Sequence, residues 1–240
     1  MRFGRFLALS LTIALAFSPA LAGPARAKDQ AAGSGAAADQ VKKIDDAVRV
    51  LQEMMKESDK GIPEGLVRDC AGIAIIPDVL RAGLVIGGRH GRGVLVVRTK
   101  DGGWSDPSFI ELTGGSIGWQ AGVQSADIIL VFRTPRSVEH IGEGKFTLGA
   151  DAGIAAGPIG RSAEASTDSE LKAEILSYSR SRGLYAGLTL QGSSLQEDRK
   201  ANGDFYGQVL SPKDIFAGKV KGAPEAAGRL RTALGAFIKR

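Results

Sequence analysis

The chain has 240 residues, 43% of them hydrophobic and 24% charged, which is enough to build one ordinary domain core. Its 31 basic and 26 acidic residues give a net charge of +5, which falls to +2 without the basic residues at 1–27. A chain so close to neutral is not expected to bind nucleic acid through its overall charge, which leaves only a local basic patch for such binding. The single cysteine, Cys70, excludes an internal disulfide and lies in the apolar stretch "RDCAGIAIIP", where we expect a small buried side chain.

Residues 1–27 have the pattern of a signal peptide for export. Arg2 and Arg5 precede an apolar run at 6–17, and two small-residue cleavage patterns follow. The run is shorter than the roughly 20 residues that a bilayer span needs. This leader holds three basic residues and no acidic one, so its removal leaves 28 basic and 26 acidic residues, a net charge of +2. We therefore expect an exported protein, periplasmic or secreted, that lies peripherally on a membrane.

A flexible linker is predicted at 28–38, because "KDQAAGSGAAA" is small and polar and has no apolar period. A single domain is then predicted at 39–240. It opens with an amphipathic helix whose apolar residues recur at helical spacing, namely Val41, Ile44, Val48, Leu51 and Met55. The polar side of this helix carries Lys42, Lys43 and Arg49 among acidic neighbours, a face that is either solvated or in contact with a membrane surface.

Beyond residue 71 the apolar pattern changes from helical to extended. Short runs rich in Ile, Val and Leu, bounded by Gly, Pro or Asp, predict strands: "GIAIIP", "AGLVIGG", "GVLVVRT", "SFIEL", "ADIILVF" and "AEILSYSR". Short helices are predicted to begin at Pro63 and Pro135, since proline suits a first helical position, and at the capping box Ser194–Glu197. A last helix is predicted at 224–238.

Glycines recur at every fourth position in four segments. These sets are Gly83, Gly87 and Gly91, then Gly114, Gly118 and Gly122, then Gly149, Gly153 and Gly157, then Gly183 and Gly187. A membrane helix with this spacing needs about 20 apolar residues in a row, whereas the third segment contains Asp151 and Pro158.

In a strand, by contrast, residues four apart lie on the same face. Each glycine set therefore leaves part of that face without side chains, and we expect another element to pack closely there. The sequence therefore predicts an α+β fold, with a glycine-rich, strongly curved, barrel-like antiparallel β-sheet, an N-terminal amphipathic helix and a C-terminal helix. Membrane insertion of the third segment is the alternative.

One motif points to catalysis. The stretch Gly114 to Gly118 matches the Gly-x-Ser-x-Gly nucleophile elbow around Ser116, which needs a strand-to-helix turn and a distant histidine. Only His90 and His140 exist, and His140 follows the serine too closely for such a hydrolase sheet. No Cys-x-x-Cys, His-Glu-x-x-His or phosphate-loop motif occurs. We predict no enzyme activity, no metal and no cofactor, with a serine hydrolase as a distant alternative.

Basic residues next to glycine-rich turns are the remaining candidates for a site. "GGRHGRG" places Arg89, His90 and Arg92 in a predicted hairpin connection, and "SYSRSRG" places Arg180 and Arg182 in another. Guanidinium groups and turn amides together bind phosphate well. These five residues are the predicted lipid head-group site, although a charged hairpin tip often serves only solubility.

The order of the segments resembles a known family. "AGLVIGGRHGRGVLVVR", "GGWSDPSFIELTGGSIGWQAGVQSADIILVF", "FTLGADAGIAAGPIGRSAEASTD" and "ILSYSRSRGLYAGLTLQGSSLQEDRKANGDFYG" are similar to the SYLF domain of yeast actin-patch and mammalian adaptor proteins, over roughly residues 44–207. The resemblance implies a domain that binds phosphorylated or anionic lipid head groups without catalysis. It also implies membrane contact through the helix that carries Lys42, Lys43 and Arg49.

Two departures from that family change the expected partners. The chain begins with an export signal and carries no Src-homology module, so actin is an improbable partner and an anionic lipid membrane is the expected one. The leading hypothesis is therefore binding of anionic phospholipid or phosphoinositide-like head groups by an exported protein. The alternative is an envelope structural or protein-interaction module whose glycine-lined sheet face receives a protein strand or helix.

Overall fold

The computed structural model describes residues 25–56, 61–83, 86–117, 122–139, 141, 145–158, 173–181, 184–187 and 190–237. The helices are α1 (Ala25–Lys56), α2 (Glu64–Asp69), α3 (Pro135–Glu139), α5 (Arg199–Tyr206), α6 (Pro212–Phe216) and α7 (Glu225–Gly235). The strands are β1 (Gly72–Gly83), β2 (Ile86–Val97), β3 (Ser108–Ile117), β4 (Gly122–Phe132), β5 (Lys145–Thr147), β6 (Ile154–Ala156), β7 (Ile175–Ser181), β8 (Leu184–Gly187) and β9 (Ser194–Glu197).

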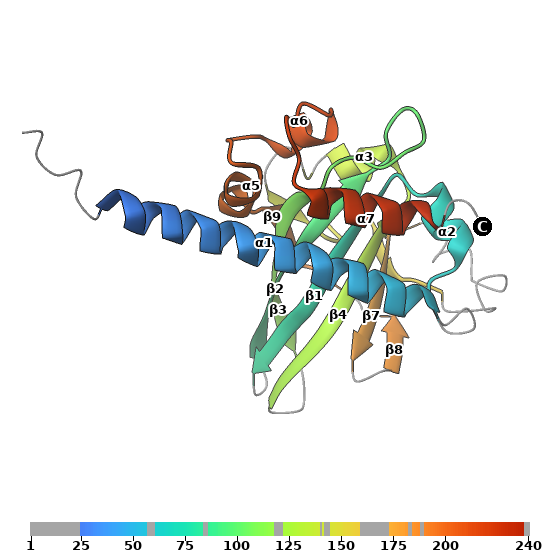
Figure 1. The fold of residues 1–240 in the computed structure, drawn as a ribbon. Helices are drawn as coiled ribbons and strands as arrows, with labels where there is room; N and C mark the ends of the chain where they lie inside the picture. Colours follow the sequence, from blue (N-terminus) through green and yellow to red (C-terminus); the bar gives the residue numbers. More distant parts are fainter. Residues whose placement is uncertain are drawn as a thin grey trace, which may run out of the picture.

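These strands form one sheet with helices at both ends of the chain, so the predicted α+β class is confirmed (Figure 1). The strand order is β5-β9-β3-β2-β1-β4-β7-β6, and β8 pairs with β7. Neighbouring strands are antiparallel except β6 and β7, which are parallel, so the sheet is mixed at that edge. The parallel pair was not predicted, because the short run 154–156 gives no direction of pairing by itself.

The sheet curls because one short segment supplies both of its edges. Strand β5 pairs with β9 at one edge, and β6 pairs with β7 at the other, yet only residues 148–153 separate β5 from β6. A bridge between Leu148 and Ala152 tightens that connection. The two edges must therefore approach each other, which gives the sheet the predicted barrel-like curvature.

Two hydrophobic cores lie on the two faces of this sheet. The interior core fills the concave side with residues that include Ile76, Val79, Leu95, Leu112, Ile128, Leu130 and Phe146. The outer core lies between the convex side and helices α1, α5 and α7, with residues that include Ile44, Leu51, Ile73, Val94, Ile129, Tyr178 and Leu230. Strand residues alternate between the two cores, as the two-residue period of a strand requires.

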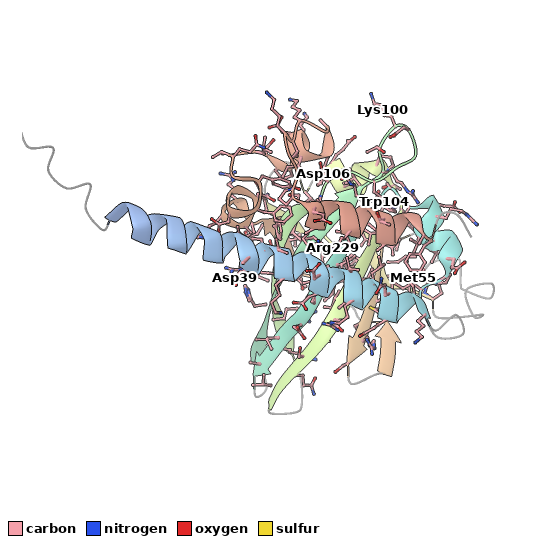
Figure 2. All side chains as sticks on the ribbon, in the orientation of Figure 1. Asp39, Met55, Lys100, Trp104, Asp106 and Arg229 are labelled. Atoms are coloured by element: carbon pink, nitrogen blue, oxygen red, sulfur yellow. The ribbon has the colours of Figure 1, made fainter. Side chains whose placement is uncertain are left out.

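Helices α1 and α7 lie side by side across the convex face (Figure 1). Figure 2 marks Asp39 and Met55 on α1 and Arg229 on α7, where the Arg229 guanidinium binds the Asp45 carboxylate with an Nη2–Oδ1 distance of 2.7 Å. The part of α1 before Asp39 extends past the sheet (Figure 2). None of the described helices is both long and apolar enough to cross a bilayer.

Several glycines of the predicted pattern lie at close contacts. A Cβ added at Gly87 would lie 2.2 Å from the Ala82 carbonyl oxygen, and one at Gly157 would lie 2.1 Å from the Tyr178 ring, whereas one at Gly153 would lie 3.9 Å from its nearest neighbour. Residues 145–158 form β5, a turn and β6, so the strand interpretation is confirmed and the membrane-helix alternative for this segment is wrong. Gly118 and Gly183 lie outside the described residues.

Two predicted helix boundaries are wrong. Helix α1 begins at Ala25, so residues 28–38 are helical rather than a flexible linker. Alanine favours helix strongly, and a helix that extends away from the sheet needs no apolar period. The capping box Ser194–Glu197 is strand β9 instead, and the helix after it begins at Arg199, where the side chain of Asp198 accepts a hydrogen bond from the Ala201 amide. The predicted helices at Pro63, Pro135 and 224–238 are confirmed as α2, α3 and α7.

Candidate anion-binding site

A polar recess lies at the hairpin end of the sheet, at one mouth of its concave side. Its volume is about 140 Å³, and it is lined by Val79, Arg81, Arg89, Gln124, Ser125, Ala126, Ile128, Ser179 and Ser181. Val79 and Ile128 belong to the interior core and form its apolar base. In Figure 1 this end of β1, β2, β4 and β7 lies at the bottom of the view.

Strand register brings two arginines together in the recess. Hairpin β1–β2 pairs Gly83 with Gly87, and therefore Arg81 with Arg89. An irregularity between Ile76 and Val79 shifts the alternation of β1. Because Val79 belongs to the interior core, Arg81 two residues later shares its concave face.

The irregularity in β1 is held by side chains as well as backbone. Asp78 has a positive φ of 51°, which is unusual for a residue other than glycine. Its backbone amide donates to the Asp127 carboxylate at 3.1 Å, and its own carboxylate accepts from the Ser125 hydroxyl at 3.5 Å. These bonds fix the point at which β1 changes face, and so fix the direction of Arg81.

The electrostatics of the recess favour an anion. The Nε and Nη1 atoms of Arg89 are buried, and no residue in the described part of the chain accepts a hydrogen bond from them. Burial lowers the pKa of Arg89, and the neighbouring charge of Arg81 lowers it further. None of the described residues that line the recess is acidic, so no carboxylate of its lining balances the charge of Arg89. A bound oxyanion would supply the missing acceptors.

His90 and Arg92 lie on the opposite face of β2 from Arg89. His90 Nδ1 is 3.2 Å from a Glu111 carboxylate oxygen, and Arg92 Nε is 3.5 Å from one of Asp198. The prediction that these residues form a hairpin connection is wrong, because β2 already begins at Ile86. The glycines around them reduce side-chain bulk within the strand and do not end it.

Arg180 also lies on the convex face, where its guanidinium binds the carboxylate of Glu53 on α1. This contact lowers the pKa of Glu53, mainly through the hydrogen bond from Arg180. Arg180 therefore joins β7 to α1 and is separated by the sheet from Arg89. Arg182 lies outside the described residues.

The cations predicted on α1 have acidic neighbours in the same helix. Lys42 Nζ is 2.8 Å from Asp46, and this contact raises the pKa of Lys42. Arg49 lies 3.4 Å from Glu53. Lys43 is partly buried. This face of the helix therefore carries cations and carboxylates in pairs at i and i+4, a pattern that weakens its net attraction for an anionic surface.

Two exposed apolar side chains lie near the recess. Leu80 is 50% exposed and Val123 is 70% exposed. They directly precede the recess residues Arg81 and Gln124, so they lie at the same hairpin end but on the opposite face of the sheet. Exposed apolar side chains next to cations suit a surface that enters a membrane interface.

The sequence predicted Arg89 but missed Arg81, Gln124, Ser179 and Ser181. A signal for Arg81 was present, because a hairpin that pairs Gly83 with Gly87 also pairs positions 81 and 89. The other three come from strands β4 and β7, whose position next to β1 cannot be read from local pattern. Within the described residues, no cluster of His, Cys, Asp and Glu could hold a metal ion.

Comparison with known proteins matches residues 113–237 to the family model Ysc84, described as Las17-binding protein actin regulator. The chain is 39% identical over 193 residues to Protein YSC84 of Saccharomyces cerevisiae, covering 77% of this chain and 41% of that protein. It is 37% identical over 186 residues to LAS seventeen-binding protein 3 of the same yeast, covering 74% and 40%.

The chain is also 34% identical over 200 residues to SH3 domain-containing YSC84-like protein 1 of Homo sapiens, covering 81% of this chain and 58% of that protein. The chain thus spans less than two thirds of the length of these curated relatives.

Proposed function

Because the chain belongs to the Ysc84 (SYLF) family, we propose that it binds anionic lipid head groups at a membrane surface and catalyses no reaction. The names of its relatives describe binding and regulatory proteins rather than enzymes. A binding function needs a surface that recognises the ligand by charge and shape, and the recess at the hairpin end of the sheet offers both.

The observation that carries this proposal is the guanidinium of Arg89, whose buried Nε and Nη1 atoms have no acceptor among the described residues, beside Arg81. Two like charges next to each other at the mouth of an apolar interior destabilise the unliganded protein. A phosphate group with two or more oxygens would accept hydrogen bonds from both arginines and offset that cost. The arrangement therefore favours a phosphorylated head group over a neutral one.

The neighbouring apolar side chains explain how a head group in a bilayer would reach the recess. Leu80 and Val123 would enter the interfacial region of the membrane while Arg81 and Arg89 contact phosphate. In this proposal the hairpin end of the sheet, and not only α1, faces the bilayer.

We place this function outside the cytoplasm, because residues 1–27 have the pattern of a cleaved export signal. An exported chain meets anionic phospholipid rather than the actin machinery named for its relatives, so we propose the lipid, and not actin, as its partner. The names of the relatives refer to Las17 and actin regulation, and those partners belong to those proteins.

The proposal is tested by sedimentation with two kinds of vesicle. One contains only neutral phospholipid, and in the other an anionic phosphomonoester lipid replaces about a quarter of the lipid molecules. We expect binding only to the anionic vesicles, with an affinity that falls as salt rises. Arg89→Gln should weaken binding about tenfold or more, since charged hydrogen bonds are lost. Lys221→Gln is the matched control, because it removes the same charge from an exposed position far along the chain.

The variant Arg92→Gln tests whether the lipid site lies in the recess or on the opposite face of β2. A loss as large as that of Arg89→Gln would move the head-group site to the convex face, against this proposal. Equal binding to neutral and anionic vesicles, or binding to neither, would overturn lipid recognition and favour a protein partner. The melting temperature of Arg89→Gln should be unchanged or higher, because a buried unpaired charge is removed.

A further inference from the structure

A second and larger cavity lies at the opposite end of the central strands. Its volume is about 680 Å³, and it is lined by Asp69, Cys70, Ala71, Val97, Arg98, Arg133, Pro135, Val138, Glu139, Lys213 and Phe216. Strand β2 begins at the anion-binding recess and ends at this cavity, so the two sites lie at opposite mouths of the curled sheet. In Figure 1 this end lies towards the top of the view, near α3 and α6.

The inner surface of the cavity is apolar. Ala71, Val97 and Phe216 pack against the interior core, and Val138 belongs to it. Cys70 is 4% exposed, and its thiol donates a hydrogen bond to the Val67 carbonyl at 3.1 Å. Burial raises the pKa of the Cys70 thiol to about 12, so this side chain adds no negative charge to the cavity at neutral pH. The inner surface therefore suits a hydrocarbon group.

Cations surround this apolar surface. Arg98 is held rigidly, because its Nη2 donates to the carbonyls of Val67 at 3.0 Å and Arg68 at 2.6 Å, and its guanidinium stacks 4.0 Å from the Trp104 ring. The other two cations that line the cavity are Arg133 on the segment after β4 and Lys213 on α6.

The cavity wall contains fewer carboxylates than cations. Asp69 lies 3.6 Å from the guanidinium of Arg68, which is outside the lining, so its charge is already partly compensated. Glu139 is exposed at the end of α3. Three cations and these two carboxylates leave a positive excess among the described lining residues.

We propose that this cavity binds a single-chain anionic amphiphile, such as a fatty acid, with its carboxylate near Arg98, Arg133 and Lys213 and its chain on the apolar surface. The volume lies within the roughly 300–1,000 Å³ typical of small-molecule sites. An inorganic anion would leave the apolar surface unused, and a cationic amphiphile would meet like charge. This site is separate from the head-group recess and does not depend on membrane docking.

The test is calorimetric titration of the full chain with dodecanoate below its micellar concentration, at pH 8 and without vesicles. We expect saturable binding of one dodecanoate, with affinity rising about fourfold per added methylene from octanoate to dodecanoate. Dodecanol and dodecyltrimethylammonium, which have the same chain without the negative charge, should bind more weakly. Absence of dodecanoate binding, or equal binding of all three head groups, would overturn the proposal.

The variant Lys213→Gln tests whether the carboxylate of dodecanoate binds near Lys213. Lys213 is exposed on α6, so its loss should leave the melting temperature unchanged and weaken dodecanoate binding about twofold to fivefold. Lys221→Gln removes the same charge outside the cavity and should leave the affinity unchanged. Equal weakening by both variants would show only a general charge effect and would contradict the assigned site.

Discussion

At the scale of single residues, several glycines in this protein allow neighbouring groups to pack closely against the backbone. Tyr178 is 3% exposed, and its ring occupies the space in which a side chain at residue 157 would lie. The sequence predicted that something packs against the glycine stripes, because residues four apart share a strand face. It did not predict the packing partner, since Tyr178 comes from another strand and reaches Gly157 only through the parallel pairing of β6 and β7.

We predict that Gly157→Ala destabilises the protein by about 1 to 3 kcal/mol. The new Cβ would lie 2.1 Å from one carbon of the Tyr178 ring and 2.5 Å from two more atoms of that side chain, so the buried ring must move. Chemical denaturation of the purified chain measures this loss as a lower midpoint with an unchanged slope.

Gly153→Ala is the matched control for this substitution. It adds the same methyl group one glycine earlier, where the nearest atoms lie 3.9 and 4.0 Å away, in ordinary contact. We expect a change within about 0.5 kcal/mol. If both variants lose the same stability, overpacking against Tyr178 is not the cause.

The candidate site shows what a local pattern can and cannot predict. Arg89 was predicted because its type and its glycine neighbours suit phosphate. The glycines around His90 and Arg92 are typical of a turn, in which all three side chains could converge. In the structure these residues belong to a strand, which sends His90 to the face opposite Arg89.

At the scale of elements, the sequence predicts α1 correctly over residues 39–56 but not before residue 39, where the helix replaces the expected linker. Its apolar positions Ile44 and Leu51 are fully buried in the outer core, as their spacing predicted. Its polar side is tied to the rest of the fold by carboxylates, with Asp45 bound to α7 and Glu53 to β7. Those partners depend on tertiary contacts that no helical period reveals.

We predict that the ion pair between Glu53 and Arg180 makes stability depend on pH. The folded pKa of Glu53 lies below its ordinary value, so its contribution is present above the unfolded pKa of about 4.3 and fades as pH falls through the folded pKa. Glu53→Gln should therefore lower stability at pH 7 and have little effect near pH 3.

The expected loss at pH 7 is about 0.2 to 1 kcal/mol, because the side chain of Glu53 is 37% exposed and solvent screens the pair. Thermal unfolding at pH 7 and pH 3, with Arg180→Gln and the double variant, isolates the pairwise part. Lys42→Gln is the control, since Lys42 pairs with Asp46 of the same helix and does not take part in the contact between α1 and β7. A loss independent of pH would contradict an ionic origin.

At the scale of the whole molecule, the fold is a curled sheet with a site at each mouth. The sequence predicted the curvature from glycine but could not show that residues 145–156 join both edges, because β5 and β6 are short and pair with strands far along the chain. That closure creates an interior core whose two ends differ. One end carries Arg81 and Arg89, and the other the larger cavity near Arg98.

The proposed export signal leads to a prediction about the whole chain. Residues 1–27 supply three of the 31 basic residues and no acidic one, so a processed chain has a net charge of only +2. Membrane binding of that chain would then depend on local cations in the recess and not on overall charge. The part of α1 before Asp39 extends past the sheet, so cleavage should remove nothing that the two cores need (Figure 1).

We therefore predict that protein recovered from the cell envelope has lost its first 22 or 27 residues, as measured by intact mass. Its melting temperature should equal that of the unprocessed chain within about 2 °C, since we expect the free energy of unfolding to change by less than about 0.5 kcal/mol. Retention of residues 1–27 in the envelope fraction, or confinement of the chain to the cytoplasm, would contradict export. A large fall in melting temperature on processing would instead show that the N-terminal part of α1 contributes to the fold.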